Sequence, residues 1–177
     1  MAPEFAWEKL RLRDCVPPAA DVLLVGINPG VRSATIGHHF AGYSNRFWKL
    51  LHESGLTAEL LRAEDDRRLP EWGLGITNLI ARPTPGIDTL RPDEYVEGLK
   101  ILRRKVRRWK PRRIAFVGVT LFRFVFSVKP AVPVALGRQP MLFEGAEVYV
   151  LPNPSGRNAN FTYQEMLDAF RSLRSRA

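Results

Sequence analysis

Hydrophobic and polar positions follow two different spacings along this chain. Apolar runs occur at 21–27, 74–79, 113–119 and 147–152, and short runs of this kind bounded by turn residues predict buried strands. Apolar residues three and four positions apart occur over 93–110, which predicts an amphipathic helix there. Strands that alternate with helices indicate an α/β fold.

The remaining segments complete a coarse map of a single domain over residues 1–177. The other elements that we expect are helices at 5–13, 45–54, 57–69 and 162–175, a short helix from Thr120, and a long loop up to Ser44. The expected architecture is a three-layer sandwich, in which helices flank a mostly parallel central sheet of about four strands.

Two of the predicted strands end in the same unusual way. One leads into "GINPG", residues 26–30, and another into "LPNPSG", residues 151–156. Asn, Pro and Gly are ordinary turn residues, so either loop alone could be a simple turn. In a parallel sheet, however, ligands bind outside the carboxyl ends of the strands, where these loops, "TNLIARPT" and "GVT" all leave the sheet. We therefore expect four strand exits to form one cleft.

Composition narrows the kind of protein. Apolar residues make up 45% of the chain, but no run of about 18 apolar residues predicts a membrane span. The N-terminal segment alternates charged and apolar residues and lacks the apolar core of a signal peptide, so we expect a cytoplasmic protein. Cys15 is the only cysteine and the histidines lack the spacing of zinc sites, so we expect no metal or other cofactor.

The net charge of +9 favours a polyanionic partner, with nucleic acid as the first candidate, although a basic surface can also serve solubility alone. The densest cluster is "RRKVRRWKPRR" at 103–113, which precedes a strand and so lies at the edge away from the expected cleft. We interpret this cluster as the solvated face of a helix that adds long-range attraction. The arginines better placed to hold phosphates are Arg32, Arg46, Arg82 and Arg157.

Three residues of the expected cleft could carry chemistry. Asn28 precedes Pro29 and is held extended, so its amide could orient a water, or it could simply stabilise a turn. Asn78 presents a donor beside an acceptor, which matches the O4 and N3–H edge of uracil, or it could satisfy the backbone at a strand end. Phe40 could stack on a base or anchor its long loop in the core.

The ordered set "GINPG", "NRFWK", "RPT" and "LPNPSG" resembles the mismatch-specific uracil-DNA glycosylases. These enzymes group with the thymine-DNA glycosylases in the uracil-DNA glycosylase superfamily, and the resemblance covers roughly residues 21–175. It implies a parallel sheet flanked by helices and excision of a base from duplex DNA without a metal.

The resemblance also implies roles for individual residues. Asn28 matches the asparagine that positions the hydrolytic water, and Phe40 matches the aromatic residue that stacks on the flipped base. Ser33 matches a serine near the 5-position of the pyrimidine, and Asn78 is similar to the uracil-reading asparagine of other superfamily branches. The remaining residues expected at the site are Ile27 and Arg32, with Asn153, Ser155, Gly156 and Arg157 from the loop that enters the duplex.

Two positions have a second interpretation. Asp93 follows Pro92 at the expected start of the long helix, so it could assist the catalytic water or cap the helix. Arg157 could fill the gap that a flipped base leaves, or it could contact a phosphate.

The sequence therefore predicts a monofunctional, monomeric DNA glycosylase that acts on uracil in duplex DNA, most readily opposite guanine. Single-stranded DNA is a further candidate substrate. The alternative from another class is a non-catalytic α/β module that binds nucleotides or nucleic acid. A phosphate-handling enzyme is disfavoured, because the chain lacks a Gly-rich phosphate loop.

Overall fold

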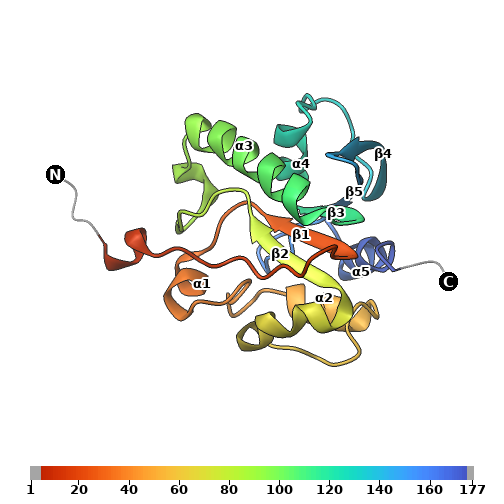
Figure 1. Ribbon diagram of the computed structural model, residues 1–177, viewed down its shortest axis with the longest axis horizontal. Coiled ribbons are helices and arrows are strands. Elements are labelled where there is room, and N and C mark those ends of the chain that lie inside the picture. Colours follow the sequence, from red (N-terminus) through yellow and green to blue (C-terminus); the bar gives the residue numbers. More distant parts are fainter. Residues whose placement is uncertain (1–4, 175–177) are drawn as a thin grey trace.

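The structure is a computed structural model that describes residues 5–174, and its centre is a five-stranded sheet in the order β2-β1-β3-β5-β4 (Figure 1). The four parallel strands are β1 (Val22–Gly26), β2 (Leu74–Asn78), β3 (Arg113–Val117) and β5 (Ala146–Leu151). These strands confirm the four runs read from the hydrophobic pattern. The predicted α/β sandwich with a mostly parallel sheet is also confirmed.

The sequence analysis missed the fifth strand, β4 (Gly137–Phe143), which pairs antiparallel with β5 at the edge of the sheet. Its residues alternate between exposed and partly or fully buried positions, and Pro140 lies within it. An edge strand tolerates proline because one side of its backbone has no ladder to complete, so a pattern search for buried strands passes over such a segment.

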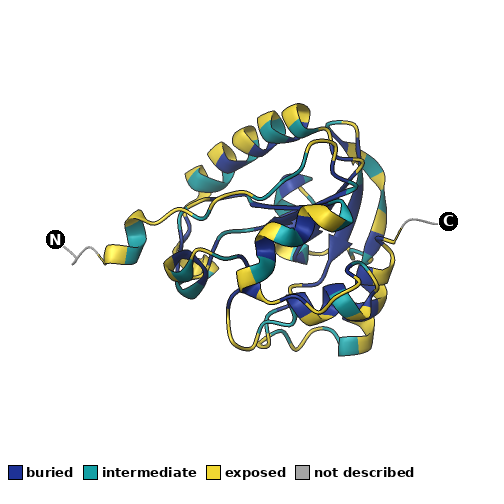
Figure 2. Cartoon of the chain, turned by 60° about the horizontal axis from the view of Figure 1, so that its bottom comes forward, coloured by how far each residue is buried: buried dark blue, intermediate teal, exposed yellow. Residues whose placement is uncertain are grey.

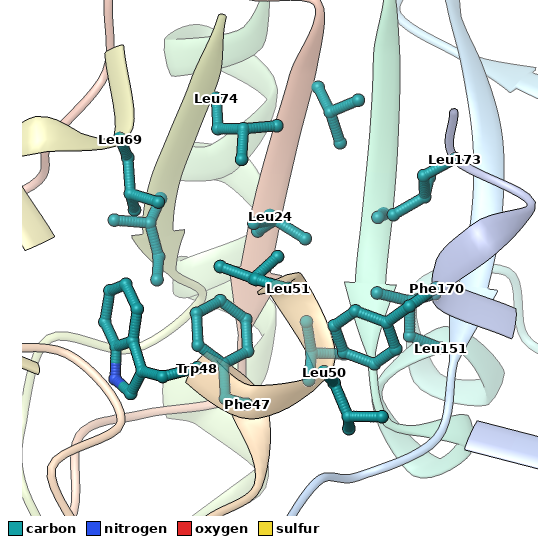
Figure 3. Close-up of a cluster of buried hydrophobic side chains, with 14 of the residues drawn as sticks. Leu24, Phe47, Trp48, Leu50, Leu51, Leu69, Leu74, Leu151, Phe170 and Leu173 are labelled. Atoms are coloured by element: carbon teal, nitrogen blue, oxygen red, sulfur yellow. The ribbon is translucent and has the colours of Figure 1, made fainter. Parts of the chain in front are cut away.

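Two layers of helices bury the two faces of the sheet (Figures 1 and 2). One face packs against α3 (Pro92–Trp109) and α4 (Val119–Val125), and the other against α2 (Phe47–Glu53) and α5 (Tyr163–Arg171). On the second face, Phe47 meets Phe170 edge-on at 6.2 Å between ring centroids (Figure 3). No helix within residues 5–174 is long and apolar enough to cross a membrane.

The predicted helices met different outcomes. The helix at 93–110 is confirmed as α3, and those at 45–54, from Thr120 and at 162–175 correspond to α2, α4 and α5, although residue 175 lies outside the described range. The segment predicted at 57–69 is instead a 3-10 helix, η2 (Ala63–Trp72), with Pro70 inside it. The expected loop before Ser44 contains a helix, α1 (Val31–Ile36), whose six residues are too few to show a helical pattern.

The helix predicted at 5–13 is wrong beyond a short 3-10 turn, η1 (Ala6–Lys9). Cys15 instead exchanges backbone hydrogen bonds with Ile76 of β2. Val16 lies so close to β2 that a Cβ at Gly75 would be 2.9 Å from it. The chain is extended at Cys15 because pairing with this strand satisfies its backbone groups, which local helical propensity could not predict.

The carboxyl ends of the parallel strands meet at one edge of the sheet, as the sequence predicts. Gly26 at the end of β1 is in register with Asn78 at the end of β2. The loop after Asn28 and the loop before Thr84 pair through a bridge between Gly30 and Thr84. This edge therefore brings together segments that lie far apart in the sequence.

Candidate active site

A cleft of about 370 Å³ opens at the carboxyl edge of the sheet. Its walls come from the loops after β1, β2 and β5, the end of β3, and the segment around Phe40. None of the described residues that line it is Lys, Arg, Asp or Glu. A neutral cleft of this kind suits an uncharged ring better than a phosphate, because no fixed charge needs to be compensated there.

Asn28 is held by the loop that follows β2. Its Nδ2 donates to the carbonyl oxygen of Arg82 at 2.9 Å and to Oγ1 of Thr84 at 2.8 Å. These two bonds use both amide protons and leave Oδ1 as an acceptor at the cleft. The side chain thus joins two loops instead of closing a turn within its own loop, and its orientation is fixed.

The loop that holds Asn28 is itself well anchored. Thr84 is buried, and its backbone N–H donates to the carbonyl oxygen of Pro29 at 3.1 Å. Before it, the N–H of Ile80 donates to the carbonyl oxygen of Ile27 at 2.8 Å, which places Ile27 at the wall of the cleft. The two loops therefore form one unit around the amide of Asn28.

Arg82 connects this loop to α3. Its guanidinium donates to both carboxylate oxygens of Glu94, at 2.6 Å and 2.9 Å. Glu94 also accepts from the backbone N–H of Arg91 at the start of the helix. The hydrogen bonds from Arg82, followed by the N–H of Arg91, lower the pKa of Glu94 to about 2 despite partial burial. The carboxylate is therefore charged throughout the neutral range.

Asn78, Gly26 and Phe40 lie together at the floor of the cleft. A Cβ at Gly26 would be 2.6 Å from Oδ1 of Asn78 and 3.5 Å from Cζ of Phe40. Only glycine leaves room for the Asn78 amide in this position, because real Cβ atoms do not approach so closely. The structure thus brings together the two residues predicted to read and to stack on a base.

Phe40 lies at the boundary between cleft and core. Its ring stacks on Phe47 with 4.1 Å between centroids and 15° between planes, while it also lines the cleft. Its φ of +49° is unusual for a residue with a side chain. Both sequence-based interpretations of Phe40 therefore apply, since it is anchored in the core and also presented to the cleft. A strained backbone that persists at a cleft is typical of a functional site.

The segment before Phe40 is fixed by a buried carboxylate. Asp66 is 3% exposed and accepts from the backbone N–H of His39 and from Nδ1 of His38. His39 is equally buried, and its Nε2 donates to the carbonyl oxygen of Arg13. Burial lowers the pKa of His39, which favours the neutral ring. These histidines are parts of a positioning network, which their sequence did not indicate.

Ser33 and Arg32 hold the other end of the same segment. Ser33 is buried in α1, lines the cleft, and accepts from the N–H of Ala41 through its Oγ at 3.0 Å. Arg32 donates to the carbonyl oxygen of Ala41 and to the hydroxyl of Tyr43, and its guanidinium lies 3.9 Å from the Tyr43 ring centroid. Arg32 is therefore engaged with this loop and does not itself line the cleft.

The loop after β5 has its own internal hydrogen bonds. Oδ1 of Asn153 accepts from the N–H of Ser155, and the side chain of Asn158 donates to the carbonyl oxygen of Asn153. Asn153 and Ser155 line the cleft. The guanidinium of Arg46 supports the loop from outside by donating to the carbonyl oxygen of Ser155 at 2.9 Å.

Gly156 and Arg157 lie further along this loop. A Cβ at Gly156 would be 2.7 Å from the carbonyl oxygen of Ser44, so this glycine allows two loops to pack together. Arg157 is exposed and lines a smaller hollow next to the cleft, together with Asn158 and Asn160.

Asp93 is not brought to the cleft. Its side chain is 73% exposed and pairs with Arg91 at 3.2 Å. The interpretation of Asp93 as the helix cap is wrong, because Arg91 occupies the N-cap position and Glu94 closes the capping box. Arg82, expected to hold phosphates, is instead bound to Glu94.

The sequence analysis did not predict the roles of three residues that support the site: Thr84, Glu94 and Asp66. A glutamate three positions after a helix cap is a recognisable capping signal, but its pairing with Arg82 depends on the tertiary fold. Among residues 5–174, no group of three or more His, Cys, Asp or Glu could hold a metal ion.

The profile of the uracil DNA glycosylase superfamily matches residues 14–174 of this chain. The chain therefore belongs to that superfamily, and it is a glycosidic-bond hydrolase of the DNA glycosylase class. Its fold is similar to the solution NMR structure of a protein from Methanosarcina acetivorans described as a candidate uracil DNA glycosylase. That structure is 19% identical in sequence, with a TM-score of 0.58 over 93% of this chain and 98% of the other.

Proposed function

We propose that this protein removes uracil from duplex DNA, most readily where uracil is mispaired with guanine. The observation that carries the proposal is the amide of Asn28, whose two protons are held by Arg82 and Thr84 while its oxygen remains an acceptor at a neutral cleft. Within the superfamily, this proposed activity corresponds to the mismatch-specific branch, which the ordered motifs of the sequence resemble.

A base within a duplex must leave the stack before its glycosidic bond can enter such a cleft. Extrusion costs about a few kcal/mol and costs less for a mispaired base, which favours uracil opposite guanine over a paired pyrimidine. Phe40 then offers one ring face for stacking, since Phe47 covers the other. Asn78 lies next to that ring and can donate and accept along the uracil edge.

The chemistry follows from these positions. The bond between C1′ of the sugar and N1 of uracil breaks, and its electron pair leaves with the base. Oδ1 of Asn28 accepts a hydrogen bond from a water and directs the water's oxygen toward C1′, where the new bond forms. The water's proton leaves with the departing uracil anion or to solvent. An amide is a poor base, so its contribution is orientation, and the neutral cleft with Asn78 stabilises the anion.

The experiment compares wild type with Asn28→Ala on duplexes that contain uracil opposite guanine or opposite adenine, with EDTA present. Heating in alkali then cuts the DNA at abasic sites. We expect wild type to cut both, with G:U faster, and the variant to be largely inactive. Cleavage by neither protein, with tight binding to DNA, would favour the alternative of a non-catalytic nucleic-acid-binding module.

A further inference from the structure

A second hollow lies at the opposite edge of the sheet from the cleft. It has a volume of about 710 Å³ and is lined by arginines from several elements. Arg112 and Arg113 stand at the amino end of β3, Arg138 is on β4, and Arg171 and Arg174 come from the end of α5. These residues are far apart in sequence, so their convergence is a property of the fold.

The charges of this arginine hollow are only partly balanced. Glu147 is the one carboxylate among the described residues that line it, and it contacts Arg138 at 3.2 Å and Arg113 at 3.9 Å. Outside the hollow, Asp21 lies 3.6 Å from Arg112 and Asp168 lies 3.4 Å from Arg171. Among the described residues, five arginines and one glutamate line the hollow, so its lining carries a positive excess.

Tyr149 adds a neutral donor to the arginine hollow. It is 6% exposed, it lies opposite Arg138 in the strand register, and it lines the arginine hollow. Within residues 5–174 its hydroxyl makes no hydrogen bond, and the oxygen is not one of the buried polar atoms that lack a partner, so it reaches solvent at the hollow. This hydroxyl is therefore free to donate to an anionic oxygen that enters the hollow beside the guanidiniums.

We infer that the arginine hollow binds phosphate groups of a nucleic-acid backbone, separately from the cleft. Guanidiniums bind phosphate oxygens in a bidentate manner, and the Tyr149 hydroxyl adds a neutral donor. A polymer fits better than a single phosphate, because the arginines are spread around a wide hollow. Exposed Arg108 and Lys110 also extend the positive charge from Arg112 along the end of α3. The protein can then hold a second DNA segment at the edge opposite the cleft, whether or not it excises uracil.

The test uses two undamaged short duplexes, one with a fluorescence donor and one with an acceptor. A protein with two DNA sites brings them together and produces energy transfer. The test variant is Arg138→Gln/Arg171→Gln, in which both side chains are largely exposed. The control Arg67→Gln/Lys129→Gln removes the same charge from exposed positions outside the hollow. A third variant, Tyr149→Phe, deletes only the hydroxyl, and thermal unfolding verifies that all variants fold.

We expect energy transfer with wild type and with the control. The test variant should bind the second duplex about tenfold more weakly, and the slope of its log binding constant against log salt concentration should be smaller by about two units. Tyr149→Phe should weaken that binding about fivefold. Equal losses in the test and control variants would overturn the inference, since only overall charge would then matter. Unchanged energy transfer in the test variant would also overturn it. Calorimetry with inorganic phosphate and dTMP completes the test. If these small molecules bind tightly, their binding depends on Arg138 and Arg171, and no energy transfer occurs, then the ligand of the hollow is a free phosphate ester and not DNA.

Discussion

Arg82 binds Glu94 through two parallel hydrogen bonds, of 2.6 Å and 2.9 Å, and the carbonyl oxygen of the same Arg82 accepts from the amide of Asn28. The loop after β2 is thereby fixed to the first turn of α3 on one side and to the candidate catalytic amide on the other. A carboxylate that does not line the cleft is therefore linked through Arg82 to the amide of Asn28.

The first prediction concerns Glu94→Gln, which loses the charge and one acceptor of this pair. We expect the rate of uracil excision under single-turnover conditions to fall about tenfold, because a misplaced catalytic group is costly, while affinity for DNA stays near wild type. Glu94→Asp should be intermediate. The matched control is Glu71→Gln, which breaks a similar bidentate pair with Arg68 on the exposed surface. Equal rates in Glu94→Gln and Glu71→Gln would show that the pair does not position Asn28.

The second prediction is a loss of stability in acid. The pKa of Glu94 is lowered to about 2 in the folded protein, below its ordinary value of 4.5. A lowered pKa stabilises the fold above the unfolded value, and this contribution is lost as the pH falls from 4.5 toward 2. We expect the free energy of unfolding to fall by about 1–3 kcal/mol more in wild type than in Glu94→Gln over this range. Urea titrations at several pH values measure this difference, and parallel curves would contradict it.

The third prediction separates Asn28 from Asp93. Asn28→Ala should lose most of the excision rate and keep its affinity for DNA, because the amide acts on the water in the transition state. Asp93→Ala should be close to wild type, since its side chain is exposed and paired with Arg91. Single-turnover rates and binding by fluorescence anisotropy measure both effects. A larger loss in Asp93→Ala would make the carboxylate the water activator and Asn28 a structural residue.

The predictable part of the site is the part that parallel-sheet geometry dictates. Asn28 and Asn78 follow apolar runs, and strands in parallel register must bring such exits to one edge. The roles of Thr84, Glu94 and Asp66 could not be predicted, because each depends on a partner from another element. Secondary structure shows the same division, since β4 and the segment at Cys15 are extended through pairing that no local pattern encodes.

The fourth prediction uses Gly26, whose missing side chain makes room for Asn78. A Cβ there would be 2.6 Å from Oδ1 of Asn78, so Gly26→Ala should turn the amide away from the cleft. We expect at least a tenfold loss of uracil excision with little change in thermal stability. Asn78→Ala should leave the base edge unpaired, at a cost of about 1–3 kcal/mol.

The two changes of this fourth prediction form a double-mutant cycle. If Gly26→Ala acts by displacing Asn78, it should cost little more in a protein that already carries Asn78→Ala. Additive losses would mean that the new methyl group acts on the substrate or on Phe40 instead. Unchanged discrimination between uracil and cytosine in Asn78→Ala would remove Asn78 from base reading.

The last prediction concerns Arg157, which is exposed at the end of the loop that Asn153 and Asn158 hold together. Extrusion of a base leaves a gap in the stack, and a guanidinium can fill part of it and stack on the neighbouring bases. We expect Arg157→Ala to slow excision from duplex DNA and to spare single-stranded DNA, where no base has to be extruded.

A phosphate contact would act differently from such a wedge. It would weaken binding to all DNA alike and reduce the slope of the log binding constant against log salt concentration by about one unit. Arg157→Leu separates the two roles, because leucine retains bulk without charge. If Arg157 is a wedge, Arg157→Leu should recover part of the duplex rate that Arg157→Ala loses, at an unchanged rate on single strands. If both variants lose the same factor on single-stranded and duplex substrates, Arg157 only holds a phosphate.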